Sequence, residues 1–241
     1  MSIPVHVALI DDTHSISAHD LAMMAGALNS QIQNDFAHVW GVKATVGVWD
    51  APPPNTWQIH IQQQLDQPGA LGYHTDNNNQ PVAYVMVTDS TSVTVSHELL
   101  EMLGDPFGSR MTTAALPQNV DPSQVGLSAG QRVHYLLELC DPCENASYQT
   151  GGVAVSDFLL PSWYRTAPSP CVQYSKTGYC KNPREVADGG YVSFSNDAQE
   201  WFQVFNQNGT LSVQDIGKFN KADFGSLREW VDSKAREHRA A

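Results

Sequence analysis

The order of hydrophobic patterns in roughly the first 105 residues is the feature that most constrains the fold. Residues 5–10 alternate apolar and less apolar side chains, which predicts a half-buried strand. Residues 17–40 then carry apolar side chains at helical spacing, and Gly41 supplies the stop. Three further strands and a second helix are predicted at residues 44–49, 57–61, 81–87 and 92–103. This order of strands and helices is typical of an α/β or α+β domain.

The second half of the chain has a different character. It is rich in Pro, Gly, Ser and Asn and carries many aromatic residues, but few long apolar periods. Short strands and a terminal helix are predicted at residues 153–155, 191–194, 201–204 and 222–240. We therefore expect an α+β protein with an N-terminal lobe at 1–110 and an irregular, aromatic-rich C-terminal lobe at 111–241, or the two as one domain.

Charge and hydropathy exclude several classes of function. The chain has 13 Lys and Arg against 25 Asp and Glu, a formal net charge of −12. This balance argues against nucleic-acid binding and against attachment to an anionic membrane, both of which need basic surfaces. Apolar runs fall far short of the ~20 residues of a membrane helix, so membrane insertion is not expected. Residues 1–10 lack Lys and Arg and show no secretory signal, which predicts a cytoplasmic protein or one exported by a non-standard route.

The predicted second helix carries the most informative motif, His97-Glu98-x-x-Glu101. His97 and Glu101 are four residues apart, so an imidazole and a carboxylate project from one helix face and can share a metal ion. Glu98 is placed to deprotonate a metal-bound water. This is the logic of the His-Glu-x-x-His helix of zinc peptidases, with Glu101 where the second His would be. The alternative interpretation is an ordinary solvated helix face.

A third ligand must come from elsewhere in the sequence. Glu138 follows an apolar run and is the first candidate, and Asp141 lies three residues beyond it. On a continuous helix Asp105 would lie too far from His97 to bind the same ion, unless the helix ends at Gly104. His134, four residues before Glu138, is the rival ligand. All four remain open from the sequence alone.

Two motifs resemble those of the plant phosphate-induced (EXORDIUM-type) proteins and of similar bacterial and fungal proteins. They are residues 97–106, which join the His-Glu-x-x-Glu helix to Asp-Pro, and residues 138–143, which join Glu-x-x-Asp to a neighbouring Cys. The resemblance implies a zincin-like fold, with a mixed sheet, an active-site helix and a metal centre. In zincins the edge strand before the active helix lines the substrate cleft. His74 precedes Asp76 in a predicted loop near this cleft and is a candidate for orienting a substrate; the alternative is an ordinary surface histidine.

The leading hypothesis is a zinc-dependent hydrolase, a metallopeptidase acting on a peptide or protein substrate. His97, Glu101 and Glu138 would hold Zn²⁺ and Glu98 would be the general base. Tyr135, Tyr148 and Tyr164 are candidates for stabilising an oxyanion. The alternatives are a non-catalytic binding or signalling protein with a structural metal centre, and a structural protein whose motif is accidental.

Four cysteines leave several states open. Cys140 and Cys143 form a Cys-x-x-Cys pair, and Cys171 and Cys180 are separated by eight residues. These spacings are compatible with an all-cysteine zinc site, two disulfides, or free or redox-active thiols.

Overall fold

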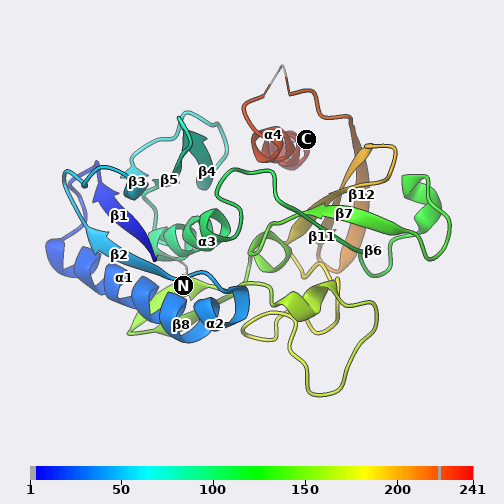
Figure 1. Ribbon diagram of the computed structural model, residues 1–241, viewed down its shortest axis with the longest axis horizontal. Coiled ribbons are helices and arrows are strands. Elements are labelled where there is room, and N and C mark those ends of the chain that lie inside the picture. Colours follow the sequence, from blue (N-terminus) through cyan, green and yellow to red (C-terminus); the bar gives the residue numbers. More distant parts are fainter. Residues whose placement is uncertain (1–3, 222–223, 241) are drawn as a thin grey trace. The chain divides into compact units, whose positions relative to one another are not determined.

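The computed structural model describes residues 4–221 and 224–240 (Figure 1). The chain divides into two compact units. The first comprises Met1–Phe107 and Ser147–Ser156, and the second comprises Gly108–Ala146 and Asp157–Ala241. The first unit therefore includes a later hairpin, which a single division near residue 110 does not anticipate.

The first unit is a five-stranded mixed sheet with two long helices. The strand order is β2-β1-β3-β5-β4, in which only β4 runs antiparallel to its neighbour. The elements are β1 (Val5–Asp11), α1 (Ala18–Gln31), a π-helical turn η1 (Ile32–Phe36), α2 (Ala37–Trp40), β2 (Ala44–Val48), β3 (Trp57–Gln62), β4 (Gly72–Asn77), β5 (Gln80–Met86), α3 (Thr91–Gly104), β8 (Ser147–Thr150) and β9 (Val153–Ser156). The four strands and both helices predicted before residue 105 are present, and β4 adds a fifth strand that pairs antiparallel with β5.

One face of this sheet is packed and the other is more exposed. In β3, Ile59 and Ile61 are fully buried, whereas Gln58 and His60 on the opposite face are only partly covered. Register places Ala83 of β5 beside Ile59, and His74 of β4 beside Ala83, so all three side chains share the packed face. Helix α3 packs against β4 and β5. His74 is consequently directed to the side of the sheet that α3 covers.

The second unit is built on an antiparallel sheet in the order β12-β11-β10-β7-β6. Its elements are β6 (Met111–Ala115), η2 (Pro122–Val125), β7 (Arg132–Leu136), η3 (Asp141–Cys143), η4 (Pro161–Tyr164), β10 (Tyr191–Ser195), β11 (Trp201–Gln207), β12 (Thr210–Gly217) and α4 (Leu227–Ala240). Together the units confirm the α+β class. Helix α4 begins later than the predicted 222, and residues 222–223 lie outside the described residues.

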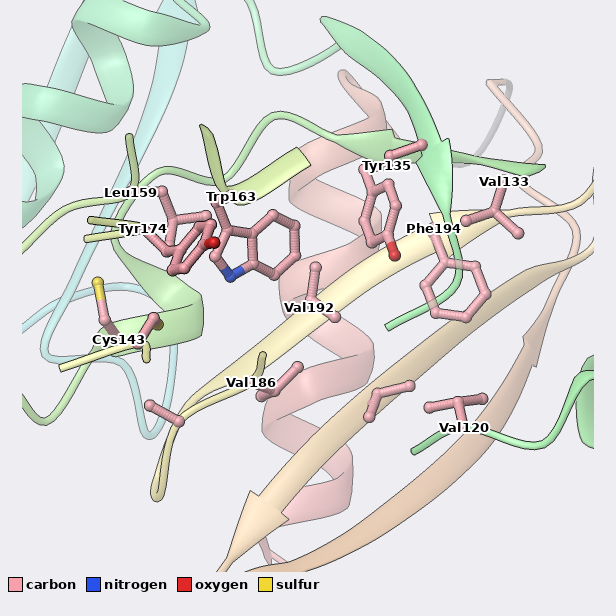
Figure 2. Packing of buried hydrophobic residues seen from close by; sticks show 14 of the residues in the cluster. Val120, Val133, Tyr135, Cys143, Leu159, Trp163, Tyr174, Val186, Val192 and Phe194 are labelled. Carbon is pink, nitrogen blue, oxygen red and sulfur yellow. The ribbon is translucent and has the colours of Figure 1, made fainter. Parts of the chain in front are cut away.

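Aromatic side chains fill the core of the second unit. Trp163 and Tyr135 are fully buried and meet edge to face, with ring centroids 5.5 Å apart, and Phe194 lies on the other side of Tyr135 (Figure 2). Such contacts stabilise the core beyond the area that they bury. The aromatic-rich sequence thus forms an ordered sheet core. Over residues 4–221 and 224–240, no helix has the length and apolar character needed to cross a membrane.

Candidate metal centre

Helix α3 presents the His-Glu-x-x-Glu motif from an almost wholly buried position. Apolar residues Leu99, Leu100 and Leu103 anchor it in the core, and Glu98 and Glu101 are buried with them, at 4% and 0% exposure. Burying a carboxylate costs several kcal/mol unless it is paired or coordinates a metal. The interpretation of this motif as a solvated helix face is therefore wrong.

The His97 and Glu101 side chains converge as the i, i+4 spacing predicts. His97 Nε2 lies 3.6 Å from Glu101 Oε1, with the two side chains 12% and 0% exposed. This separation is longer than a normal hydrogen bond. Two ligand atoms bound to one tetrahedral Zn²⁺ at about 2.1 Å stand about 3.4 Å apart, so the observed distance fits a shared ion.

Glu98 points to the sheet rather than along the His97 face. Its Oε2 lies 3.5 Å from Nδ1 of His74. A Cβ built at Gly72 would come within 2.8 Å of Glu98 Oε1. Gly72 and His74 share the packed face of β4, and the missing side chain of Gly72 leaves room for the carboxylate.

His74 lies in β4 and is buried at 3% exposure, which corrects the expectation of a loop residue. Its Nε2 is 3.1 Å from the carbonyl oxygen of Asp105. A carbonyl only accepts, so this nitrogen donates, and Nδ1 is the atom that faces Glu98. This hydrogen bond ties His74 to the end of α3.

A buried polar network fixes the start of the motif within the first unit. Ser96 precedes His97 and donates its hydroxyl to Gln31 of α1 at 2.8 Å. The same hydroxyl accepts from the backbone N–H of Ser156 at 3.0 Å, and the Gln31 amide donates to the Ser156 carbonyl at 2.9 Å. Helix α3 is thus tied to both α1 and β9, which restricts how the motif can rotate.

In the second unit, Glu138 and Asp141 meet a third carboxylate. Glu138, Asp141 and Asp232 of α4 are all buried, with ligand atoms within 4.8 Å of one another. The guanidinium of Arg228 forms ion pairs with two of these carboxylates. Its Nη2 lies 3.6 Å from Asp141 and its Nε lies 3.3 Å from Asp232. The Ser193 backbone N–H donates to Glu138 at 3.3 Å.

The charges of this cluster affect the pKa of the buried Tyr191 phenol. Burial raises the pKa of Tyr191 well above its usual 10.0, and the charges of Asp141, Asp232 and Glu138 raise it further, while Arg228 lowers it. The phenol therefore stays protonated and donates to Asp232 at 3.5 Å. The cluster therefore combines three buried carboxylates with the buried guanidinium of Arg228.

Other predicted residues lie in different settings. Asp105 is buried at the end of α3. His134 lies on β7. Its Nδ1 lies 3.0 Å from Thr113 and its Nε2 lies 3.1 Å from the exposed Asp197, so both ring nitrogens have partners outside the acidic cluster.

The tyrosines proposed for oxyanion stabilisation also have structural contacts. Tyr135 donates to the carbonyl of Ala115 at 2.7 Å, and Tyr148 donates to Asp35 at 2.8 Å. Tyr164 packs edge to face on Trp163 in the core of the second unit. None of these contacts gives a tyrosine a role in catalysis.

Three residues of the acidic cluster were not anticipated from the sequence: Tyr191, Arg228 and Asp232. Arg228 and Asp232 are an i, i+4 pair of the terminal helix and lie among its apolar stripe of Leu227, Trp230 and Val231. A charged pair within an apolar stripe is the signal that could have marked them.

The cysteines do not form a metal site. None of the four forms a disulfide; Cys171 is exposed and the others are buried. Within the described residues, the groupings of side chains able to hold a metal include no cysteine. An all-cysteine zinc site is therefore not supported by this geometry.

Comparisons with family models, with curated proteins and with solved structures find no match for this chain. Its function is therefore inferred from its own residues.

Proposed function

We propose that this chain is a zinc-dependent hydrolase of the metallopeptidase type. Its ion is held by His97 and Glu101 of α3 and, as third ligand, by Glu138. Glu98 is the general base, and the substrate is a peptide or protein.

The observation that carries the proposal is the pairing of His97 with a fully buried Glu101. Their ligand atoms are 3.6 Å apart, too far for a good hydrogen bond and suited to a common ion. Imidazole and carboxylate together are a donor set that Zn²⁺ prefers. A cation bound at this helix would offset part of the desolvation cost of its two buried carboxylates.

The topology of the first unit supports a zincin-like arrangement. Helix α3 directly follows β5, and the antiparallel strand β4 forms the edge of the sheet next to it. This is the arrangement expected of a zincin, in which that edge strand borders the substrate. Gly72 and His74 bring β4 against Glu98, so strand and general base are held together.

Each side chain then has a distinct task. Zinc, when bound, supplies a Lewis acid that polarises the substrate carbonyl and acidifies water. Glu98 accepts a proton from the attacking water and returns it to the leaving amine, and His74 lies against the Glu98 carboxylate. Glu101 adds more negative charge than a second His would, so slower turnover is expected than with two His ligands.

Elemental analysis of the purified protein beside His97→Ala tests the metal centre. We expect a zinc stoichiometry near one in the parent and its loss in the variant. His134→Ala is the matched control and should keep the metal, because His134 is engaged by Thr113 and Asp197. Absence of metal from the parent would refute the proposal.

Glu98→Gln separates a hydrolase from a binding protein. It should retain zinc and lose hydrolysis of a denatured protein substrate such as casein. A parent that binds zinc but cleaves nothing across a peptide library would favour the non-catalytic alternative.

The third ligand is tested by Glu138→Ala, which should lose most of its zinc, whereas Asp105→Ala should lose less. The opposite ranking would assign the ligand to Asp105.

A further inference from the structure

Two cysteines distant in the sequence share the core of the second unit. Cys143 and Cys180 are about 37 positions apart, and both belong to the aromatic cluster around Trp163. Cys143 is labelled in that cluster with Leu159 and Tyr174 (Figure 2). Neither thiol has a task in the proposed hydrolase.

The two sulfurs are neighbours. A side-chain hydrogen bond joins the thiols of Cys143 and Cys180. The Cys180 sulfur also lies 3.8 Å from the carbonyl oxygen of Pro142, the residue bonded to Cys143. A disulfide needs Cα atoms about 4.4–6.8 Å apart, and two thiols in hydrogen-bond contact are close to that requirement.

We propose that Cys143 and Cys180 form a disulfide when the chain folds in the presence of a small-molecule disulfide oxidant. This pairing differs from both local pairings suggested by the sequence, Cys140 with Cys143 and Cys171 with Cys180. It closes a long loop and ties η3, which follows Glu138, to the segment before Glu185. It does not depend on the metal centre.

The reaction with oxidised glutathione balances as two exchanges. One cysteine thiolate attacks the glutathione disulfide and releases one reduced glutathione, leaving a mixed disulfide. The second cysteine attacks this mixed disulfide, forming the Cys143–Cys180 bond and releasing a second reduced glutathione. Two thiol hydrogens and two electrons pass from the protein to the oxidant. Burial shields both thiols in the folded chain, so the bond forms while the chain is folding.

Peptide mapping tests the pairing directly. The full-length chain is refolded with and without a mixture of oxidised and reduced glutathione, alkylated and digested with trypsin without reduction. Cleavage after Lys and Arg places Cys140 and Cys143 in residues 133–165, Cys171 in 166–176 and Cys180 in 177–181. We expect a linked pair of 133–165 with 177–181 in the oxidised sample, with the bond at Cys143 by fragmentation.

Matched variants secure the assignment. Cys140→Ser and Cys171→Ser should keep the linked pair, whereas Cys143→Ser and Cys180→Ser should abolish it. The oxidised chain should also melt about 5–10 °C above the reduced chain, because a cross-link across a long loop restricts the unfolded state. Four alkylated cysteines after oxidative refolding to the native circular dichroism spectrum would overturn the proposal. So would a link within 133–165, one through Cys140, or one between 166–176 and 177–181.

Discussion

At the residue scale, His74 is the side chain whose replacement tests how Glu98 is held in the core. His74→Phe keeps a ring in the site but removes the hydrogen bond to the Asp105 carbonyl and the imidazole that faces Glu98. Leaving buried polar groups without these contacts should lower the free energy of unfolding by about 2–4 kcal/mol. Urea denaturation measures the difference.

His60→Phe is the matched control for this change. His60 lies on the opposite face of the same sheet, in a partly exposed contact with Asp12 at 2.9 Å. Its replacement should cost less than about 1 kcal/mol. If both variants lost the same free energy of unfolding, the contacts of His74 with Glu98 and Asp105 would contribute no more to stability than the exposed contact of His60.

Buried tyrosines predict how the second unit responds to high pH. Burial, followed by neighbouring acidic charge, raises the pKa of Tyr191, and burial likewise raises the pKa of Tyr135 despite the lowering effect of Arg184. A folded pKa above the unfolded value means that the phenols favour the folded state fully below pH 10.0, and that stability falls as pH rises above it.

Absorbance at 295 nm against pH should therefore show two tyrosines ionising only as the chain unfolds. Tyr191→Phe should remove one of them from the late step. The interpretation fails if every tyrosine titrates while the circular dichroism of the fold is unchanged.

Only part of the candidate site was within reach of sequence reasoning. The spacing of His97 and Glu101 is local, so helical geometry alone brings them together. The contact between Glu98 and His74 depends on strand register and on the absence of a side chain at Gly72, which no local pattern encodes. Arg228 was likewise hidden, because its partner Asp141 lies far away in the sequence.

At the scale of elements, α4 is predicted to hold the Glu138–Asp141 segment through Arg228. The guanidinium is 3% exposed and contacts both Asp141 and Asp232. Arg228→Met should destabilise the second unit by about 3–5 kcal/mol, because it removes the cation from a buried acidic group. Lys234→Met removes a cation from an exposed ion pair on the same helix and should cost less than about 1 kcal/mol.

Thermal and urea unfolding of the two variants would provide the comparison. Adding Asp232→Asn to Arg228→Met should restore part of the loss, because one carboxylate no longer needs a counter-charge. No difference between Arg228→Met and Lys234→Met would show that α4 docks through its apolar stripe alone.

The elements themselves were predicted unevenly, for a physical reason. Strands β1, β2, β3 and β5 carry regular alternation or apolar runs and were predicted, as were β9, β10 and β11, whereas β7 and β8 were not. Strands β6 and β12 were missed, since β6 has a single buried residue and β12 has none. The β8–β9 hairpin is assigned to the first unit through its contacts with α1 and α3, which follow from packing and not from local sequence.

At the scale of the whole molecule, the proposed centre makes stability depend on metal. The proposed ligands His97, Glu101 and Glu138 come from segments far apart in the sequence, so zinc binding is expected to be linked to folding of the chain. An ion bound only by the folded chain stabilises it by about 4 kcal/mol at a thousandfold excess over Kd. Chelation should therefore lower the melting temperature clearly, and added zinc should restore it.

Variants at neighbouring positions of α3 decide what this dependence means. Glu98→Gln should melt like the parent and respond equally to chelator, because Glu98 is proposed to move a proton and not to bind the ion. His97→Ala should begin at the chelated melting temperature and respond little, because it has already lost the metal. If Glu98→Gln instead lost its zinc, Glu98 would be a ligand, and the general base would have to be sought elsewhere. If the parent kept its melting temperature after its zinc was removed, the ion would not couple to folding.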